Sequence, residues 1–127
     1  MFETARLDAA PVVTAPDGTD VRPLLTLAGG SFAHFTLPSG QTSIAVQHRT
    51  VEEIWFITAG AGEMWRRQEG REEVVPLEPG VCLTLPLGTA FQFRSTAEPL
   101  QMVAVTMPPW PGEDEAFSVE GPWEPKL

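Results

Sequence analysis

The chain has few of the residues that nucleic-acid-binding, membrane-bound and disulfide-linked proteins need. It has one lysine, Lys126, and a net charge of −9, whereas nucleic acids and anionic membranes select basic patches. Its apolar runs are too short to span a bilayer, and its first residues do not resemble a signal peptide. The only cysteine, Cys82, excludes an internal disulfide. We therefore expect a cytoplasmic protein with no nucleic-acid or membrane partner, and a buried, inert thiol.

Helical periodicity is also absent, and the segments between turns read as strands. The 127 residues include 13 prolines and 11 glycines, yet 43% are hydrophobic, which predicts many turns within a folded chain. About nine strand-like runs recur at spacings of roughly ten residues. They include residues 21–27, 31–37, 53–58, 81–85 and 100–107. This pattern predicts one all-β domain, either a sandwich or a barrel.

Two stretches hold the polar residues with the most specific spacing. In the first, Gly40, His48, Glu53 and Gly60 stand at intervals that resemble the first motif of the cupin family, G-x5-H-x-H followed by E-x6-G. His48 takes the place of the second histidine of that motif. Val46 takes the place of the first histidine, so one nitrogen ligand of the family pattern is replaced by carbon.

The second stretch resembles the second cupin motif, G-x5-P-x-G-x2-H-x3-N. Gly80, Pro86 and Gly88 match its first half, while Phe91 and Ser95 replace the histidine and the asparagine. The resemblance implies a cupin-type double-stranded β-helix, a jelly-roll barrel, with its core at about residues 20–107. Residues 1–19 would form an N-terminal arm, and residues 108–127 a tail rich in proline and tryptophan.

The pair His48 and Glu53 is the leading candidate for chemistry. In a cupin both side chains would point into the barrel, and Glu52 would point outward. A buried histidine beside a buried carboxylate is costly unless the two are well bonded. The pair could therefore be part of a metal ligand set, an acid–base couple or a structural bond, and the residues leave these three interpretations open.

His34 is the only other histidine. If its strand face points inward, His34, His48 and Glu53 would form a two-histidine, one-carboxylate set suited to one divalent metal, Fe, Mn, Ni or Zn. If the face points outward, His34 is a partly buried residue bonded to the backbone, and two protein ligands would hold a metal only weakly.

The replaced ligand positions make the predicted pocket apolar. Val46 and Phe91 should line it together with His48 and Glu53, and four further residues are candidates for its wall: Trp55, Trp65, Phe93 and Met102. Such a pocket suits a flat or apolar small molecule. The competing interpretation is that several of these side chains fill the barrel core.

Two functions follow as hypotheses. The first is a protein that binds a small organic molecule in an apolar barrel pocket with a degenerate or weak metal site. The second is a metal-dependent cupin enzyme, of the dioxygenase or isomerase type, that uses His48 and Glu53. The number of metal ligands separates the two.

Apolar residues on both strand faces, as in Ile54-Trp-Phe-Ile57, predict a homodimer. In the tail, Trp110 and Trp123 could cover the mouth or edge of their own barrel, or cross to a second subunit.

Overall fold

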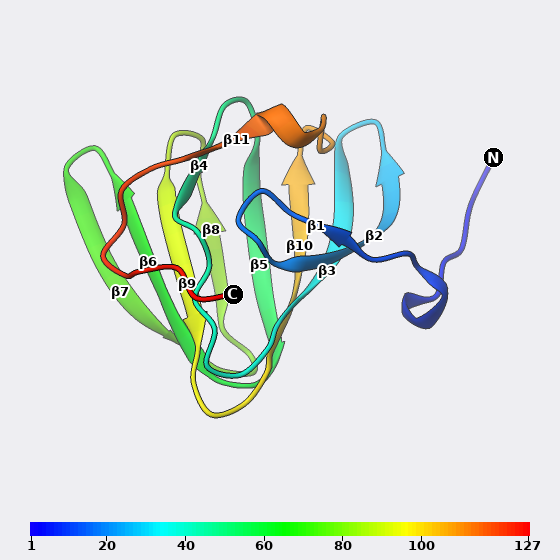
Figure 1. Cartoon of the computed structure of the whole chain (residues 1–127). Coiled ribbons are helices and arrows are strands. Elements are labelled where there is room, and N and C mark those ends of the chain that lie inside the picture. The colour runs from blue at the N-terminus through cyan, green and yellow to red at the C-terminus, as the bar shows by residue number, and fades with distance from the viewer.

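Two antiparallel sheets face each other in the computed structural model, which describes all 127 residues (Figure 1). The six-stranded sheet has the order β1 (Val13–Thr14), β2 (Asp20–Leu27), β3 (Gly30–Leu37), β10 (Leu100–Met107), β5 (Glu52–Ala59) and β8 (Cys82–Leu85). The five-stranded sheet has the order β11 (Ala116–Ser118), β4 (Val46–His48), β9 (Ala90–Ser95), β6 (Gly62–Gln68) and β7 (Arg71–Leu77). This is the predicted jelly-roll architecture.

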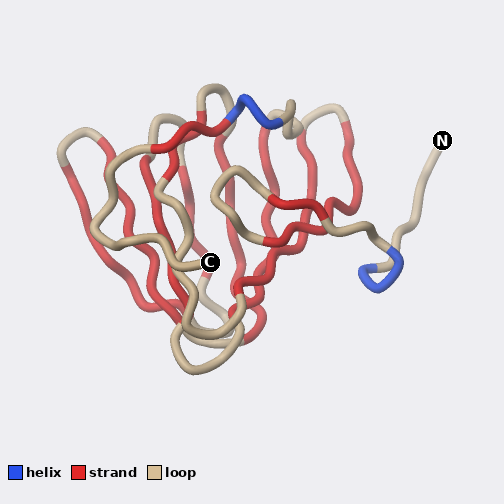
Figure 2. Tube along the Cα trace, viewed as in Figure 1, coloured by secondary structure: helices blue, strands red, loops and turns tan.

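Strands account for nearly all the regular structure (Figure 2). The only helical segments are two single turns of 3-10 helix, η1 (Leu7–Ala9) and η2 (Glu113–Glu115), so no helix could cross a membrane. Eleven strands replace the predicted nine or so. Two of the shortest, β1 and β11, lie in the predicted arm and tail and extend the sheets at their edges.

Side-chain alternation places the core between the sheets. In β5, Trp55 and Ile57 are buried while Ile54 and Phe56 are exposed, as the two-residue period of a strand requires. A cluster of 15 buried hydrophobic residues fills the space between the sheets, with Trp55 among its largest members. The same alternation corrects the expectation for Cys82, which is exposed because Leu83 and Leu85 take the inward positions of β8.

Glycines of both cupin-like motifs lie in turns where the backbone has a positive φ. Gly60 has a φ of 86°, and a Cβ at this position would lie 2.0 Å from the carbonyl oxygen of Pro99. Both the left-handed conformation and the close approach therefore select glycine here. Gly80 and Gly88 also have positive φ and stand just before and just after β8. The cupin-like spacing thus marks the turns that align β5 and β8.

The tail covers its own barrel. The side-chain amide of Gln92 donates to the carbonyl oxygens of Ser43 and Trp123, and the Trp123 amide donates back to Gln92 Oε1 at 3.1 Å. Trp123 also packs against Ala45, Trp65 and Ala90 on the outer face of the five-stranded sheet. In this structure the C-terminal segment therefore covers the outer face of β9.

The outer face of the six-stranded sheet stays uncovered. Phe32, Ile54 and Phe56 are 42%, 40% and 45% exposed. They lie side by side, because Val105 of β10 pairs with both Phe32 and Ile54, and Val103 pairs with Phe56. Contiguous exposed apolar surfaces are typical of protein–protein interfaces. We propose that two copies of the chain associate through this face and bury about 1,000 Å² or more.

The charged substitution Phe56→Asp should separate the dimer, because it places an unpaired carboxylate at the centre of the proposed interface. Light scattering at micromolar concentration should give a dimer mass for the wild type and a monomer mass for the variant. Val74→Asp, at an exposed position of β7, is the matched control and should remain dimeric. A monomer mass for the wild type would contradict the proposal.

Candidate functional site

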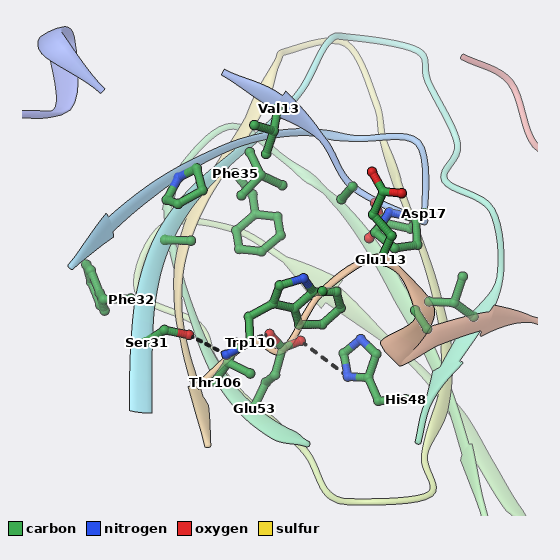
Figure 3. A pocket seen from close by; sticks show the side chains of 18 of the residues that line it. Val13, Asp17, Ser31, Phe32, Phe35, His48, Glu53, Thr106, Trp110 and Glu113 are labelled. Carbon is green, nitrogen blue, oxygen red and sulfur yellow. Dashed lines mark hydrogen bonds and ion pairs between the residues drawn. The ribbon is translucent and has the colours of Figure 1, made fainter. Parts of the chain in front are cut away.

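A cavity of about 400 Å³ opens between the two sheets beneath β1 and the tail. Its apolar wall includes Phe35 (Figure 3) and also Val46, Trp55 and Phe91. Trp55 stands at the centre of this wall, stacked on Phe35 at 5.3 Å between ring centroids and edge-on to Phe91 at 5.9 Å. The wall is therefore a rigid aromatic surface.

His48 and Glu53 project into this cavity from neighbouring elements. His48 ends β4, Glu53 lies near the start of β5, and the corner between them turns both side chains inward. His48 Nδ1 lies 3.8 Å from Glu53 Oε1, and the residues are 8% and 4% exposed (Figure 3). The two side chains therefore share one small space, and Glu52 points outward.

The Glu53 carboxyl is held by two uncharged donors. Trp55 Nε1 donates to Oε1 at 3.3 Å, and the hydroxyl of Thr106 donates to Oε2. Thr106 reaches it because the two residues are cross-strand partners on β10 and β5. Burial raises the pKa of Glu53 to about 7, although both hydrogen bonds act in the opposite direction. Near neutral pH this carboxyl is therefore about half protonated.

His48 is uncharged under the same conditions. Its ring is edge-on to Phe91 and to Trp110, with centroids 5.3 Å apart in each case. Burial lowers the pKa of His48 to about 4, and the negative charge of Glu115 only partly offsets the effect. The contact with Glu53 is therefore not an ion pair at pH 7. It joins a neutral imidazole to a carboxyl that can hold or release one proton.

Glu115 fixes the corner between the two site residues. Its carboxylate accepts hydrogen bonds from the amides of Thr50 at 2.7 Å and Val51 at 3.1 Å, and from the Thr50 hydroxyl. Burial raises the pKa of Glu115, but these hydrogen bonds outweigh it and the net pKa lies below the ordinary value. Next to it, β11 pairs with β4 so that Ala116 lies opposite His48. The tail thus holds the site loop in place.

Three predicted wall residues lie elsewhere. Phe93 and Met102 belong to the hydrophobic core and do not line the cavity; Phe93 packs edge-on against Trp55 at 5.0 Å. Trp65 lies on the opposite face of its strand, against Ala45 and Ala90. Its neighbour Met64 takes the inward position instead. The competing interpretation, core packing, therefore holds for these three residues.

His34 lies outside the cavity, so the predicted ligand set of His34, His48 and Glu53 does not form. Alternation along β3 turns Phe35 inward and His34 outward, beside Arg22, Thr36 and Gln101. With His34 outside, no group of three or more His, Cys, Asp or Glu side chains is arranged to hold a metal ion. The residues present therefore do not fit the metal centre that the cupin resemblance implied.

Several cavity residues have no counterpart in the sequence motifs. Asp17 comes from the turn after β1, and Trp110 from the tail, where its amide donates to Ser31 Oγ at 2.9 Å (Figure 3). Phe35 lies in the predicted strand over residues 31–37, but no motif marks it as a pocket residue. Asp17 lies in the predicted N-terminal arm, where no motif marks a site residue. A tryptophan in a proline-rich tail was the one available signal for Trp110.

Solved structures of similar fold support the architecture. A Streptomyces PAC13 variant with uridine superposes with a TM-score of 0.75 at 12% identity, covering 94% of this chain and 92% of that one. A predicted oxalate decarboxylase from Thermotoga maritima gives 0.67 at 20% identity, with coverages of 83% and 98%. KdgF from Halomonas sp. gives 0.71 at 15% identity, with coverages of 85% and 94%.

No family model and no curated protein sequence matches the chain. At these identities the superpositions establish the fold, and the chain is a cupin-fold protein. Its function has to be argued from the cavity.

The substitution Glu53→Gln should change how stability depends on pH. The pKa of Glu53 is about 7 when folded and 4.5 ordinarily, so its proton stabilises the fold fully below pH 4.5 and loses that effect as the pH rises through 7. Glutamine never ionises. The unfolding free energy of the variant, relative to wild type, should therefore rise by roughly 3 kcal/mol between pH 4.5 and pH 8.

Urea unfolding at several pH values measures this difference. The lowered pKa of His48 and the raised pKa of Asp17 affect both proteins, so their contributions cancel in the comparison. Glu52→Gln, at the exposed neighbouring position, should show no such trend. A difference between Glu53→Gln and wild type that stays constant with pH would show that Glu53 titrates normally.

The substitution Glu115→Ala should destabilise the protein by about 2–4 kcal/mol, because it leaves the amides of Thr50 and Val51 without their acceptor. Glu113→Ala, at an exposed position two residues earlier, should change stability by less than about 0.5 kcal/mol. Thermal or chemical unfolding measures both. Equal effects of the two substitutions would mean that the carboxylate of Glu115 does not hold the site loop.

Proposed function

We propose that this chain binds a small organic molecule in the cavity between its sheets, with His48 and Glu53 as the polar groups that orient it. The observation that carries the proposal is the combination of an aromatic wall with one convergent polar pair in a cavity of about 400 Å³. Ligand sites are typically apolar cavities with a few placed polar groups. A barrel interior needed only for stability would be filled by side chains.

The proposal does not require a metal. Val46 and Phe91 present carbon at two positions where the cupin motifs place histidine, and both border the same cavity as His48. Two protein ligands fall short of the three that catalytic metal sites normally keep. We therefore expect any divalent metal to bind weakly.

The similar structures are compatible with a ligand of this class. PAC13 is a nucleoside dehydratase whose structure was determined with uridine. Uridine combines a flat ring with polar substituents, and a cavity of this volume has room for a molecule of that size. The two proteins are similar in fold, and uridine is therefore a suitable probe molecule for this chain.

A second candidate function is acid–base catalysis on the bound molecule. The observation that favours it is the pKa of Glu53, raised by burial to about 7, where a carboxyl can both accept and donate a proton. His48 is neutral and can accept a proton from the same ligand. In this form the enzyme would act through its own side chains. The metal-dependent dioxygenase or isomerase alternative lacks a third protein ligand.

Replacement of His48 by alanine should weaken binding of a small molecule at least about fivefold, since the loss of one hydrogen bond to a buried polar group costs of order 1 kcal/mol or more. It should cost little stability, because the side chain borders a cavity. Ligand-observed NMR with a panel of flat heterocycles, including uridine and indole, measures binding. His34→Ala, which alters the outward-facing histidine, is the matched control and should bind as the wild type does.

Two results would overturn this proposal. If His48→Ala unfolds readily but binds normally once refolded, the pair with Glu53 is structural. If elemental analysis finds one tightly held metal per chain that His48→Ala loses, the metal-dependent alternative replaces it.

A further inference from the structure

The charges around the cavity are all of one sign. Three carboxylate side chains line it, from Asp17, Glu53 and Glu113, and no lysine or arginine does. His48 adds no positive charge near neutral pH, because burial keeps its pKa at about 4. We propose that the ligand carries a positively charged nitrogen, such as a protonated amine, on a flat apolar body. This inference deepens the proposed function and rests on it.

Asp17 is the residue that points most directly to such a ligand. It is 5% exposed, and its Oδ1 accepts from the amide and the hydroxyl of Thr19, at 3.0 and 2.6 Å. Its Oδ2 receives no hydrogen bond from another residue, although the side chain lines the cavity (Figure 3). The bonds from Thr19 occupy Oδ1 and explain how Asp17 shapes its turn, and they leave Oδ2 able to accept a further partner. A cationic donor in the cavity would supply that partner.

The position of Asp17 is fixed before any ligand arrives. Its carbonyl oxygen accepts from the amide of Ile44 at 2.9 Å, and the Gly18 amide donates to the Ala15 carbonyl within the same turn. These bonds hold the backbone of the turn, and the bonds from Thr19 hold the carboxylate against it. Burial raises its pKa more than the hydrogen bonds from Thr19 lower it, so in the empty cavity the charged form is disfavoured.

The charged form of Glu53 is disfavoured by burial in the same way as that of Asp17. Its hydrogen-bond donors, Trp55 and Thr106, carry no charge, and the charges of Asp17 and Glu115 add to burial in raising its pKa. A cation between the two cavity walls would favour the ionised form of both buried carboxyls. An anion would meet acidic side chains and no lysine or arginine, so carboxylate or phosphate ligands are disfavoured.

The aromatic wall suits the same kind of molecule. Trp55 and Phe35 stack on each other and, with Phe91 and Trp110, border the cavity that the carboxylates face. Aromatic faces attract cations when water is excluded and also stack on flat rings. A neutral flat ligand would gain only the second of these interactions.

Binding of a cation should be linked to proton release. The titratable groups that face the cavity or act on it are Asp17, His48, Glu53, Glu113 and Glu115. With a pKa of about 7, Glu53 is about one-tenth ionised at pH 6 and about nine-tenths ionised at pH 8. A cation that requires the ionised carboxylate should therefore bind roughly tenfold more tightly at pH 8 than at pH 6.

Three indole probes that share one ring and differ in charge test the proposal. Tryptamine is a cation, tryptophol is neutral and indole-3-propionate is an anion. Calorimetric titration at pH 8 should rank their affinities in that order, with tryptamine about tenfold tighter than tryptophol. The preference should shrink at pH 6 and be lost in Asp17→Asn and Glu53→Gln. Glu52→Gln, at the outward-facing neighbour of Glu53, is the control and should keep it.

The outcomes separate the two proposals. If tryptophol or indole-3-propionate binds in the cavity as tightly as tryptamine, and His48→Ala weakens that binding, the small-molecule function stands and the cationic ligand class is wrong. If tryptamine prefers the protein but Asp17→Asn and Glu53→Gln keep the preference, the cation binds elsewhere and the inference fails. If none of the probes binds at millimolar concentration, and the heterocycle panel also fails, the proposed function falls as well.

Discussion

The buried carboxyl of Glu53 is the constraint on which the rest of the site depends. Its strand position is dictated by packing, because Trp55 and Ile57 must face the core and Glu53 shares their side of β5. A charge there is costly, so the group is held by uncharged donors and its pKa rises to about 7. Burial likewise lowers the pKa of His48 and keeps its ring neutral. The proton-handling character of the pair is thus a consequence of where the fold places it.

The tail turns this strand corner into a defined site. Glu115 satisfies the amides of the loop between His48 and Glu53, and Trp110 closes one side of the cavity above the histidine ring. Both residues lie outside the part of the chain that resembles cupins. The site therefore combines a fold shared with many proteins and a C-terminal segment that gives this cavity its own shape and charge.

The strands and the pair His48–Glu53 could be predicted from the sequence, because turn residues and two-residue alternation act locally. The wall of the cavity could not be predicted as well. Trp65 takes the outer face of β6 because alternation along the strand is shifted by one position, whereas Phe93 faces inward but packs in the core and does not line the cavity. Asp17 joins the site through a contact between its turn and residue 44, far along the chain, and no local pattern records such a contact.

A direct titration of the two side chains tests the central claim, that a neutral His48 and a proton-carrying Glu53 share this cavity. Carbon-13 NMR of labelled glutamate and histidine, assigned with Glu53→Gln and His48→Ala, follows each group separately. The structure predicts a midpoint near 7 for the Glu53 carboxyl and near 4 for the His48 ring. A carboxyl that is fully ionised at pH 6, beside an imidazolium that persists at that pH, would instead establish an ion pair and contradict the account.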